Sequence, residues 1–579
     1  MNERVTAIRT RKAKRWGVAV AVALVGSVVG TSASQASPQA GATDAPKLGG
    51  SITVAIDGPV GGHCFSTALA GGGLGTSRAI YEQLFERTRS GKFVGFLAQS
   101  ATTSDNIVWN IKLRPGIKYS NGEAFNAANV KQNMDIGRGI LTSSAQAGYL
   151  STGVAVNANI VSVDVVDDLN VKVTLDRPDT ALPALMYRAG RYVMRAPAQI
   201  ADTATCQTNP IGTGPFMKKS YVPEELVVVR NPNYWRKDGK GRQLPYLDEI
   251  AFISVKEASQ RAAAVRRKTV DVAFFTQGDA TFTNDLSRRK SVVKGYKSTP
   301  TAWGQWVPNV GKAGSPFKFK NCRLAAAHSV DWNAYNKVRL KGIGSYTGTM
   351  VGKSNPMYTT KGATKFNLAK AKGYLAACNT DLGSAGPMKL TLYADQSSQS
   401  LNNTKFIMEQ MKKAGIQFND IFVAEATVLI SRIYAAGGNA FDFAQGTPAE
   451  GASPAYVFPF FLSKAFPANA KSPVYKLSYG SGRFNSILAL GNHGDTKVDD
   501  LLYAAQAESN PAKAKKAWQE AAQYLQAEGY VIPTVHGGFQ VFTNNKSKLG
   551  GVGTLRMPSG DLSDIVETKG FEYTGIWKK

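Results

Sequence analysis

The chain has 579 residues, of which 43% are hydrophobic and 19% charged, so it can build several packed domains and is not globally disordered. It carries 69 Lys and Arg against 41 Asp and Glu, a formal net charge of +28, but no groove-reading motif accompanies this charge. We therefore expect no nucleic-acid partner and interpret the charge as a basic surface facing anionic polymers of the cell envelope. Four cysteines and four histidines exclude a dense disulfide scaffold and a His-rich metal centre.

The first 36 residues have the pattern of an export signal. Basic residues precede an apolar stretch at 16–30, which is shorter than the roughly 20 residues that span a bilayer. The small residues at 31–36 fit a cleavage site, and no cysteine for lipid attachment follows, the first being Cys64. We predict a signal peptide at 1–36, a flexible tether at 37–46 and an extracytoplasmic body, secreted or associated with the envelope. An uncleaved N-terminal anchor is the alternative.

Strand and helix patterns alternate along the body of the chain. Short β-branched runs predict strands, and two of them flank Asp167 to Asn170 as a hairpin. Apolar residues at helical spacing predict helices, the clearest of which has Asn510 at its N-cap, Pro511 in its first turn and Gly529 at its end. The predicted strands are 51–56, 163–166, 171–175 and 226–229, and the predicted helices are 367–379, 498–505 and 511–529. This mixture indicates α/β or α+β architecture.

The sequence contains segments that resemble enzyme motifs, but each motif is incomplete. Residues 348–354 resemble a phosphate-binding loop but have one residue too few between the glycines, and 71–75 lack the third glycine of a dinucleotide fingerprint. No nucleophile elbow is present. His63 and Cys64 are the only adjacent soft ligands, and no second pair stands at metal-ligand spacing. We expect no enzyme, no metal and no cofactor, although a secreted hydrolase built on two carboxylates would leave no motif and stays an alternative.

A series of segments resembles one family in order along most of the chain, from Gly49 to about Asn545. The most distinctive begins at residue 109 with Trp-Asn-Ile-Lys-Leu-Arg-Pro-Gly. The others lie at 50–54, 81–86, 209–216, 230–235, 246–250, 322–331 and 531–533. Together they resemble extracellular solute-binding proteins of family 5, the dipeptide, oligopeptide and nickel class, which are the capture subunits of ATP-driven importers.

The resemblance implies a mixed α/β, two-lobed periplasmic-binding-protein-like fold (type II, cluster C-like) with a hinge. We place lobe I at 47–275 with an extra subdomain near 88–195, lobe II at 276–530, and the return to lobe I at 531–579. Sequence alone allows three pairings of four cysteines. Because bridges across the cleft would lock the hinge, the resemblance favours Cys64–Cys206 and Cys322–Cys378.

The resemblance also implies a ligand partner in lobe II. Peptide-binding relatives carry an Asp there that pairs with the peptide ammonium, and Glu450 takes that position after the strand at 441–443. Glu450 is an acceptor-only carboxylate that suits an ammonium, with a solvated loop residue as the alternative. Other cleft candidates come from positions that face the cleft in relatives, each with core packing as the alternative. They are His63, Phe65, Trp303, Trp306, Asn309, Phe484 and Asn485.

The function implied is capture of a peptide or similar polar solute and its delivery to an ABC permease with its ATPase subunits. A monomer is expected. A ligand sensor on the same fold, without transport, is a further alternative, as is the hydrolase named above.

Overall fold

The computed structural model describes residues 45–64, 72–138, 159–187, 190–298, 304–425, 441–445, 494–567 and 570–579, together with isolated positions between them. The chain divides into Met1–Ala45 and Pro46–Lys579, and every described helix and strand belongs to the second unit.

The largest sheet has seven strands in the order β12-β18-β11-β1-β10-β9-β8. Strand β1 runs parallel to both of its neighbours, β10 and β11, while the remaining pairs are antiparallel. The strands are β1 (Ser51–Ile56), β8 (Phe216–Val222), β9 (Glu225–Arg230), β10 (Glu249–Ser254), β11 (Val272–Phe275), β12 (Val293–Lys297) and β18 (Gln540–Asn544).

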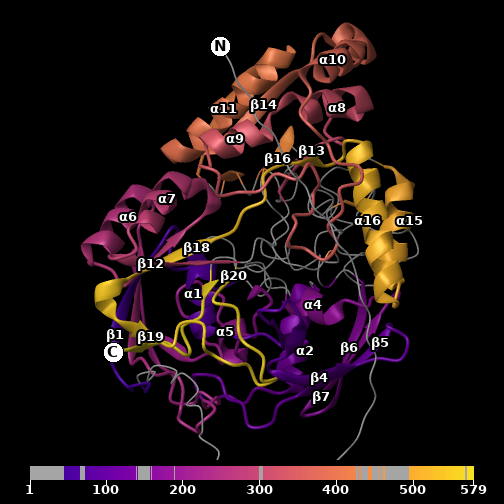
Figure 1. Ribbon diagram of the computed structural model, residues 1–579. Coiled ribbons are helices and arrows are strands. Elements are labelled where there is room, and N and C mark those ends of the chain that lie inside the picture. The colour runs from indigo at the N-terminus through magenta and orange to yellow at the C-terminus, as the bar shows by residue number, and fades with distance from the viewer. Residues whose placement is uncertain are drawn as a thin grey trace, which may run out of the picture. The chain divides into compact units, whose positions relative to one another are not determined.

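Both faces of this sheet are covered. On β1, Val54 belongs to one buried cluster and Ala55 to another on the opposite face, as the two-residue period of a strand requires. Helix α1 (Gly72–Ile80) contributes Ile80 to the first cluster, and α6 (Ala258–Arg267) with α7 (Ala280–Arg288) covers the second, next to edge strand β12 (Figure 1).

A separate four-stranded antiparallel sheet, in the order β4-β5-β7-β6, lies within the stretch predicted to be an extra subdomain. Strands β6 and β7 form the hairpin expected around Asp167 to Asn170, and β7 alternates strictly between buried and half-buried positions. Its strands are β4 (Ala98–Thr102), β5 (Val108–Leu113), β6 (Ile160–Asp167) and β7 (Asn170–Leu175); nearby are β2 (Phe85–Arg87), β3 (Phe93–Gly95), α2 (Ala127–Gly137), α4 (Leu182–Tyr187) and α5 (Pro197–Ala201).

The middle of the chain builds a different core. A three-stranded sheet, β16-β13-β17, and a parallel pair, β14 and β15, pack with helices around Trp332, Cys378 and Leu390. The strands are β13 (Gln305–Pro308), β14 (Lys389–Asp395), β15 (Gln417–Ala424), β16 (Phe443–Gln445) and β17 (Ile532–Pro533). The helices are α8 (Lys320–Ser329), α9 (Trp332–Val338), α10 (Leu368–Leu382) and α11 (Ser398–Ala414), with 3-10 turns at Gln277–Asp279, Pro316–Lys318 and Gly383–Ala385.

Helices α15 (Thr496–Ala507) and α16 (Pro511–Ala527) pack side by side (Figure 1). The side chain of Asn510 accepts hydrogen bonds from the backbone N–H groups of Ala512 and Lys513, which confirms the predicted N-cap. Gly529 follows the helix with φ of +71°, a conformation that glycine adopts without strain.

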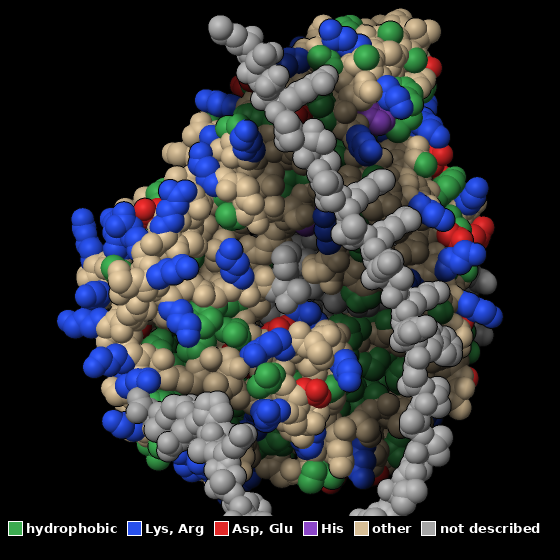
Figure 2. Space-filling model, in the orientation of Figure 1, with side chains coloured by type: hydrophobic (Ala, Val, Ile, Leu, Met, Phe, Trp, Pro, Cys, Tyr) green, Lys and Arg blue, Asp and Glu red, His purple; other side chains and the backbone are tan. Residues whose placement is uncertain are grey.

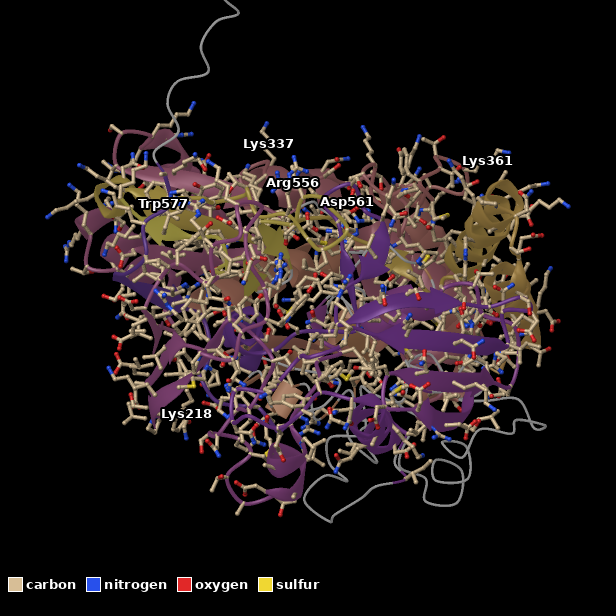
Figure 3. The ribbon with its side chains drawn as sticks, turned by 90° about the horizontal axis from the view of Figure 1, so that it is seen from below. Lys218, Lys337, Lys361, Arg556, Asp561 and Trp577 are labelled. Carbon is tan, nitrogen blue, oxygen red and sulfur yellow. A yellow bond between two sulfur atoms is a disulfide. The ribbon has the colours of Figure 1, made fainter. Side chains whose placement is uncertain are left out.

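The C-terminal residues after β18 lie on the same side of the molecule as the seven-stranded sheet. Strands β19 (Leu549–Gly550) and β22 (Trp577–Lys578) pair, as do β20 (Val566–Glu567) and β21 (Gly570–Phe571), after a 3-10 turn η8 (Asn545–Ser547). The turn that carries Arg556 and Asp561, both labelled in Figure 3, lies between β19 and β20 in the chain and is closed by a bridge between Arg556 and Leu562.

Two disulfides join Cys64 to Cys206 and Cys322 to Cys378, the pairing that the resemblance favoured. The second bridge ties α8 to α10. Among the helices that the structure describes, none has the length and apolar character needed to cross a bilayer.

The outward connection between the lobes was predicted after residue 275, before β12. Strand β12 pairs with β18 along its whole length, so the chain stays with the large sheet until Lys297 and joins the three-stranded sheet at Gln305. The return runs from Pro533 to Gln540.

Candidate functional site

Two chain connections link the seven-stranded sheet to the three-stranded sheet, and they lie against one another. The backbone N–H of Ser298 donates to the carbonyl of Phe539 at 2.9 Å, and that of Thr534 donates to the carbonyl of Gly304 at 2.8 Å. The connections therefore run antiparallel, as the two crossing segments of a hinge would.

Glycines allow this close approach. A Cβ atom on Gly304 would lie 2.5 Å from the carbonyl oxygen of Val535, and one on Gly537 would lie 2.0 Å from the side-chain oxygen of Gln277. A larger residue at Gly304 would force the backbone apart, whereas one at Gly537 would displace the Gln277 side chain.

His536 fastens the connections to each other and to a neighbouring loop. Its Nδ1 accepts a hydrogen bond from the backbone N–H of Gly304 at 3.1 Å, which places the ring proton on Nε2. Nε2 lies 2.8 Å from the carbonyl oxygen of Thr349, to which it donates. The ring is 1% exposed, so the neutral imidazole is a structural link within the hinge region.

The three-stranded sheet next to this hinge has two different faces. Trp306, Phe443 and Ile532 share one face and belong to the middle core. Alternation along β13 puts Gln305 and Val307 on the other face. Val307 belongs to a buried cluster that also contains Met194, from beside the four-stranded sheet, and Leu502 of α15. Gln305 thus lies on the face where the two parts of the chain meet.

Gln305 is buried without hydrogen bonds. Its side chain is 1% exposed, yet neither its amide nitrogen nor its amide oxygen has a partner among the described residues. An unpaired buried amide is costly, and such groups point to a ligand or ordered water. The sequence prediction missed Gln305, although a lone polar residue before Trp306 in an apolar strand was a usable signal.

The side chains of Trp306 and Asn309, both predicted to contact ligand, contact other residues of the protein. The Trp306 ring packs edge-to-face on Trp332 with ring centroids 5.5 Å apart. The Asn309 side chain is fully buried, donates to the carbonyl of Phe441 at 3.0 Å and accepts from the backbone N–H of Lys312 at 3.1 Å. Both side chains make contacts within the protein that help to hold the strand in place.

The loop after β1, which holds His63, is anchored from several directions. The Cys64–Cys206 disulfide ties it to the segment after α5, and the Gln199 side chain donates to the carbonyl of His63 at 3.0 Å. His63 itself is fully buried, its Nε2 lies 3.1 Å from the carbonyl of Val60, and its Nδ1 is unpaired. Burial lowers the pKa of His63 from 6.5 to about 4, so the imidazole is neutral near pH 7.

Arg195 lies against the same loop. Its Nη1 donates to the carbonyl of Cys64, while Nε and Nη2 have no hydrogen-bond partner in the described part of the chain although the side chain is 1% exposed. Burial lowers its pKa to about 10, and no carboxylate among the described residues forms a salt bridge with it. The backbone around Arg195 is held by Asn133, whose side-chain oxygen accepts from the Arg195 N–H at 3.0 Å. A buried guanidinium with free donors suits an anionic group.

Three of the distinctive sequence segments meet at Glu82. Its carboxylate accepts hydrogen bonds from Thr213 at 3.0 Å, from Tyr234 at 2.9 Å and from the indole of Trp235 at 2.8 Å. Burial raises the pKa of Glu82 to about 7 despite these bonds. Nearby, a Cβ on Gly212 would lie 2.0 Å from the carbonyl oxygen of Ile80, so these motif residues serve the architecture.

Comparison with known proteins identifies the family. The model of bacterial extracellular solute-binding proteins, family 5, middle region, matches residues 92–463. The chain belongs to this family. It is 23% identical over 467 residues to the glutathione-binding protein GsiB of Escherichia coli K12, covering 79% of this chain and 83% of that protein.

Solved structures show the same two-lobed fold. The solute-binding protein is similar to AgaA of A. tumefaciens R10, solved with agropinic acid, with a TM-score of 0.73, 20% identity, and coverage of 92% of this chain and 99% of that one. It is also similar to DppA of Helicobacter pylori, solved with the peptide STSA, with a TM-score of 0.71 and 18% identity. That match covers 92% of this chain and 98% of DppA. The predicted fold class and the role as substrate-binding component of an ABC importer are confirmed.

Part of the predicted ligand set of this solute-binding protein lies outside the described residues, namely Glu450, Phe65, Trp303, Phe484 and Asn485. Where the structure describes side chains, no three His, Cys, Asp or Glu residues come together as a metal site. The relatives are binding proteins.

Proposed function

We propose that this protein captures a short peptide, or a similar solute with peptide-like polar groups, between its two lobes and delivers it to an ABC permease and its ATPase. The observation that carries the proposal is the buried amide of Gln305 on the face where the lobes meet, which has no hydrogen-bond partner among the described residues. An amide donates and accepts, so it matches the backbone of a peptide.

The similar proteins bind solutes of this chemistry. GsiB is a glutathione-binding protein, DppA was solved with the peptide STSA, and AppA of Bacillus subtilis was solved with a nonapeptide. Each ligand carries amide and carboxylate groups, and the unpaired donors of Arg195 would suit a carboxylate.

Glu450 is our candidate partner for the ammonium group of the solute. In the sequence it follows β16, and β16 pairs with β13, the strand that carries Gln305. A carboxylate, an amide and a guanidinium would together recognise the two ends and the backbone of a peptide.

We further propose that lobe I comprises residues from 47 to the end of β12 together with the C-terminal segment from β18, and that lobe II lies between the connections. Both disulfides then fall within lobes, which leaves the hinge free to close on solute. Removal of the signal at 1–36 would release the protein outside the cytoplasm as a monomer.

Native mass spectrometry of the purified protein, followed by release and sequencing of any bound molecule, tests the ligand class. Co-purified short peptides, reduced in a Glu450→Gln variant, would support both the peptide and its ammonium partner. A single non-peptide species would discard the peptide assignment. Peptides retained at full occupancy in the variant would discard Glu450 alone.

Transport is tested separately from binding. Deleting the gene and measuring uptake of the identified solute separates an importer subunit from a sensor on the same fold. Unchanged uptake in the deletion strain would contradict the proposed delivery to a permease.

A further inference from the structure

One edge of the seven-stranded sheet collects basic side chains from three separate segments. Strands β1, β11 and β12 run in the same direction, and β18 runs against β11 and β12. The starts of β11 and β12 and the end of β18 therefore lie at one edge. Helix α6 ends just before β11, α7 ends just before β12, and η8 follows β18.

The exposed basic residues at this edge are Arg267, Lys268, Arg288, Lys290, Lys546 and Lys548, and we call them the basic edge. The three segments are in contact, because the side chain of Asn545 donates to the carbonyl of Lys290 at 2.9 Å. Basic side chains gather over α6, α7 and β12 at the left margin of Figure 2.

Two carboxylates beside the basic edge have basic partners. Asp285 pairs with Arg289 at 2.9 Å and with Arg266 at 3.7 Å, and Asp271 pairs with Lys578 at 3.6 Å. The six basic-edge residues form no ion pair among the described residues. Basic residues in the last turn of a helix stabilise the helix dipole, which explains Arg267 and Arg288. Lys290, Lys546 and Lys548 lie beyond any α-helix, so helix stabilisation does not explain them.

We propose that the basic edge docks the protein on an anionic membrane surface by binding lipid headgroups. The chain enters the sheet at this same edge: Ser51 starts β1, and its carbonyl accepts from the Lys578 side chain at 2.9 Å. The predicted tether at 37–46 therefore precedes a segment that enters the folded body at the basic edge. Clustered Lys and Arg residues near an anionic membrane surface attract its lipid headgroups, each contributing about 1 kcal/mol.

Such docking would hold lobe I near the membrane while lobe II stays free to move. It is independent of the solute and of the residues proposed to bind it. It also gives the high net charge a location, because the basic edge presents its charges together on one rigid sheet edge.

Vesicle co-sedimentation tests the proposal with the chain lacking residues 1–36, since Pro46–Lys579 is a structural unit separate from Met1–Ala45. The vesicles contain phosphatidylcholine alone or with about 30% phosphatidylglycerol. We expect binding to the anionic vesicles only, and its loss between about 50 mM and about 500 mM salt. Binding to both vesicle types, or to neither, would overturn the proposal.

A charge-reversal variant locates the site. The combination R267E/R288E/K290E/K546E should weaken vesicle binding at least about tenfold. The matched control K370E/K372E/K513E/K515E changes the net charge equally, on exposed residues of α10 and α16, and should keep binding near that of the parent chain. Equal losses in both variants would show that net charge alone is responsible and would contradict a docking edge.

A soluble polymer, poly(glycerol phosphate), separates two sources of phosphate. Binding of the polymer without binding to anionic vesicles would overturn membrane docking in favour of an envelope polymer. Thermal unfolding of both variants confirms that they are folded, because all eight substituted side chains are exposed.

Discussion

The Nδ1 atom of His536 accepts a hydrogen bond from the backbone N–H of Gly304 at 3.1 Å, joining the two segments that connect the sheets of this protein. The opposite ring nitrogen donates to Thr349. One neutral imidazole thus spans three segments that are far apart in the sequence.

His536→Ala should lower the free energy of unfolding by about 3 kcal/mol, because it leaves the buried N–H of Gly304 unpaired, removes a hydrogen bond to the carbonyl of Thr349 and opens a cavity. Urea denaturation measures this loss. The control is His328→Ala, which removes a half-buried ring with one hydrogen bond, to the carbonyl of Lys365 at 2.7 Å, and should reduce stability by about 1 kcal/mol. Equal losses in the two variants would contradict a linking role for His536.

Gln305→Leu should leave the solute-free protein as stable as the parent, or more so, because it removes an amide with no partners. The control Gln526→Leu removes a buried amide that accepts from Met350 N–H at 2.9 Å and donates to Gly362 O at 2.8 Å, and should destabilise by about 1–3 kcal/mol. Affinity for the co-purified solute should fall in the Gln305 variant alone. Unchanged affinity would remove Gln305 from the proposed site.

Acid should destabilise the protein through His63. Its folded-state pKa of about 4 is below the usual 6.5, so the unfolded chain takes up this proton first as the pH falls. Between pH 6.5 and 4, the parent should lose about 3 kcal/mol more than a His63→Gln variant. Denaturation curves at several pH values measure this difference. Parallel pH profiles would show that His63 is not held neutral by burial.

Glu82 should make the stability of the protein depend on pH in the opposite direction. Its folded-state pKa of about 7 lies above the usual 4.5, so the folded protein holds this proton, and stability is lost as the pH rises from 4.5 through 7. Relative to the parent, Glu82→Gln should therefore gain about 3 kcal/mol between pH 4.5 and 8. A difference that does not change with pH would contradict the raised pKa.

Removing one disulfide should lower the free energy of unfolding without impairing solute binding. The Cys322–Cys378 bridge closes a loop with a sequence separation of 56 residues, and a Cys322→Ser/Cys378→Ser double variant should lose about 2–4 kcal/mol. Urea denaturation gives the loss, and affinity for the co-purified solute gives the control. A large loss of affinity in a folded variant would argue against a bridge confined to one lobe.

Local patterns in the sequence predicted local structure well. The helix from Pro511 was predicted from its cap and its apolar spacing, and the hairpin around Asp167 to Asn170 from its turn. Ordered motifs identified the family and, through it, the two-lobed fold and the cysteine pairing. These features depend on neighbouring residues or on a resemblance that runs along the chain, so no knowledge of distant contacts was needed.

Tertiary structure decided which polar and charged groups are free. The sequence predicts Trp306 and Asn309 as ligand contacts, and in the structure their side chains contact residues from distant segments of the chain. Gln305 is left unpaired because strand alternation turns it to the other face. Segments around 267, 288 and 546 form one basic edge only because parallel strands align their ends. Whether a buried group keeps a free donor depends on partners from distant segments, and only the folded chain brings those partners into place.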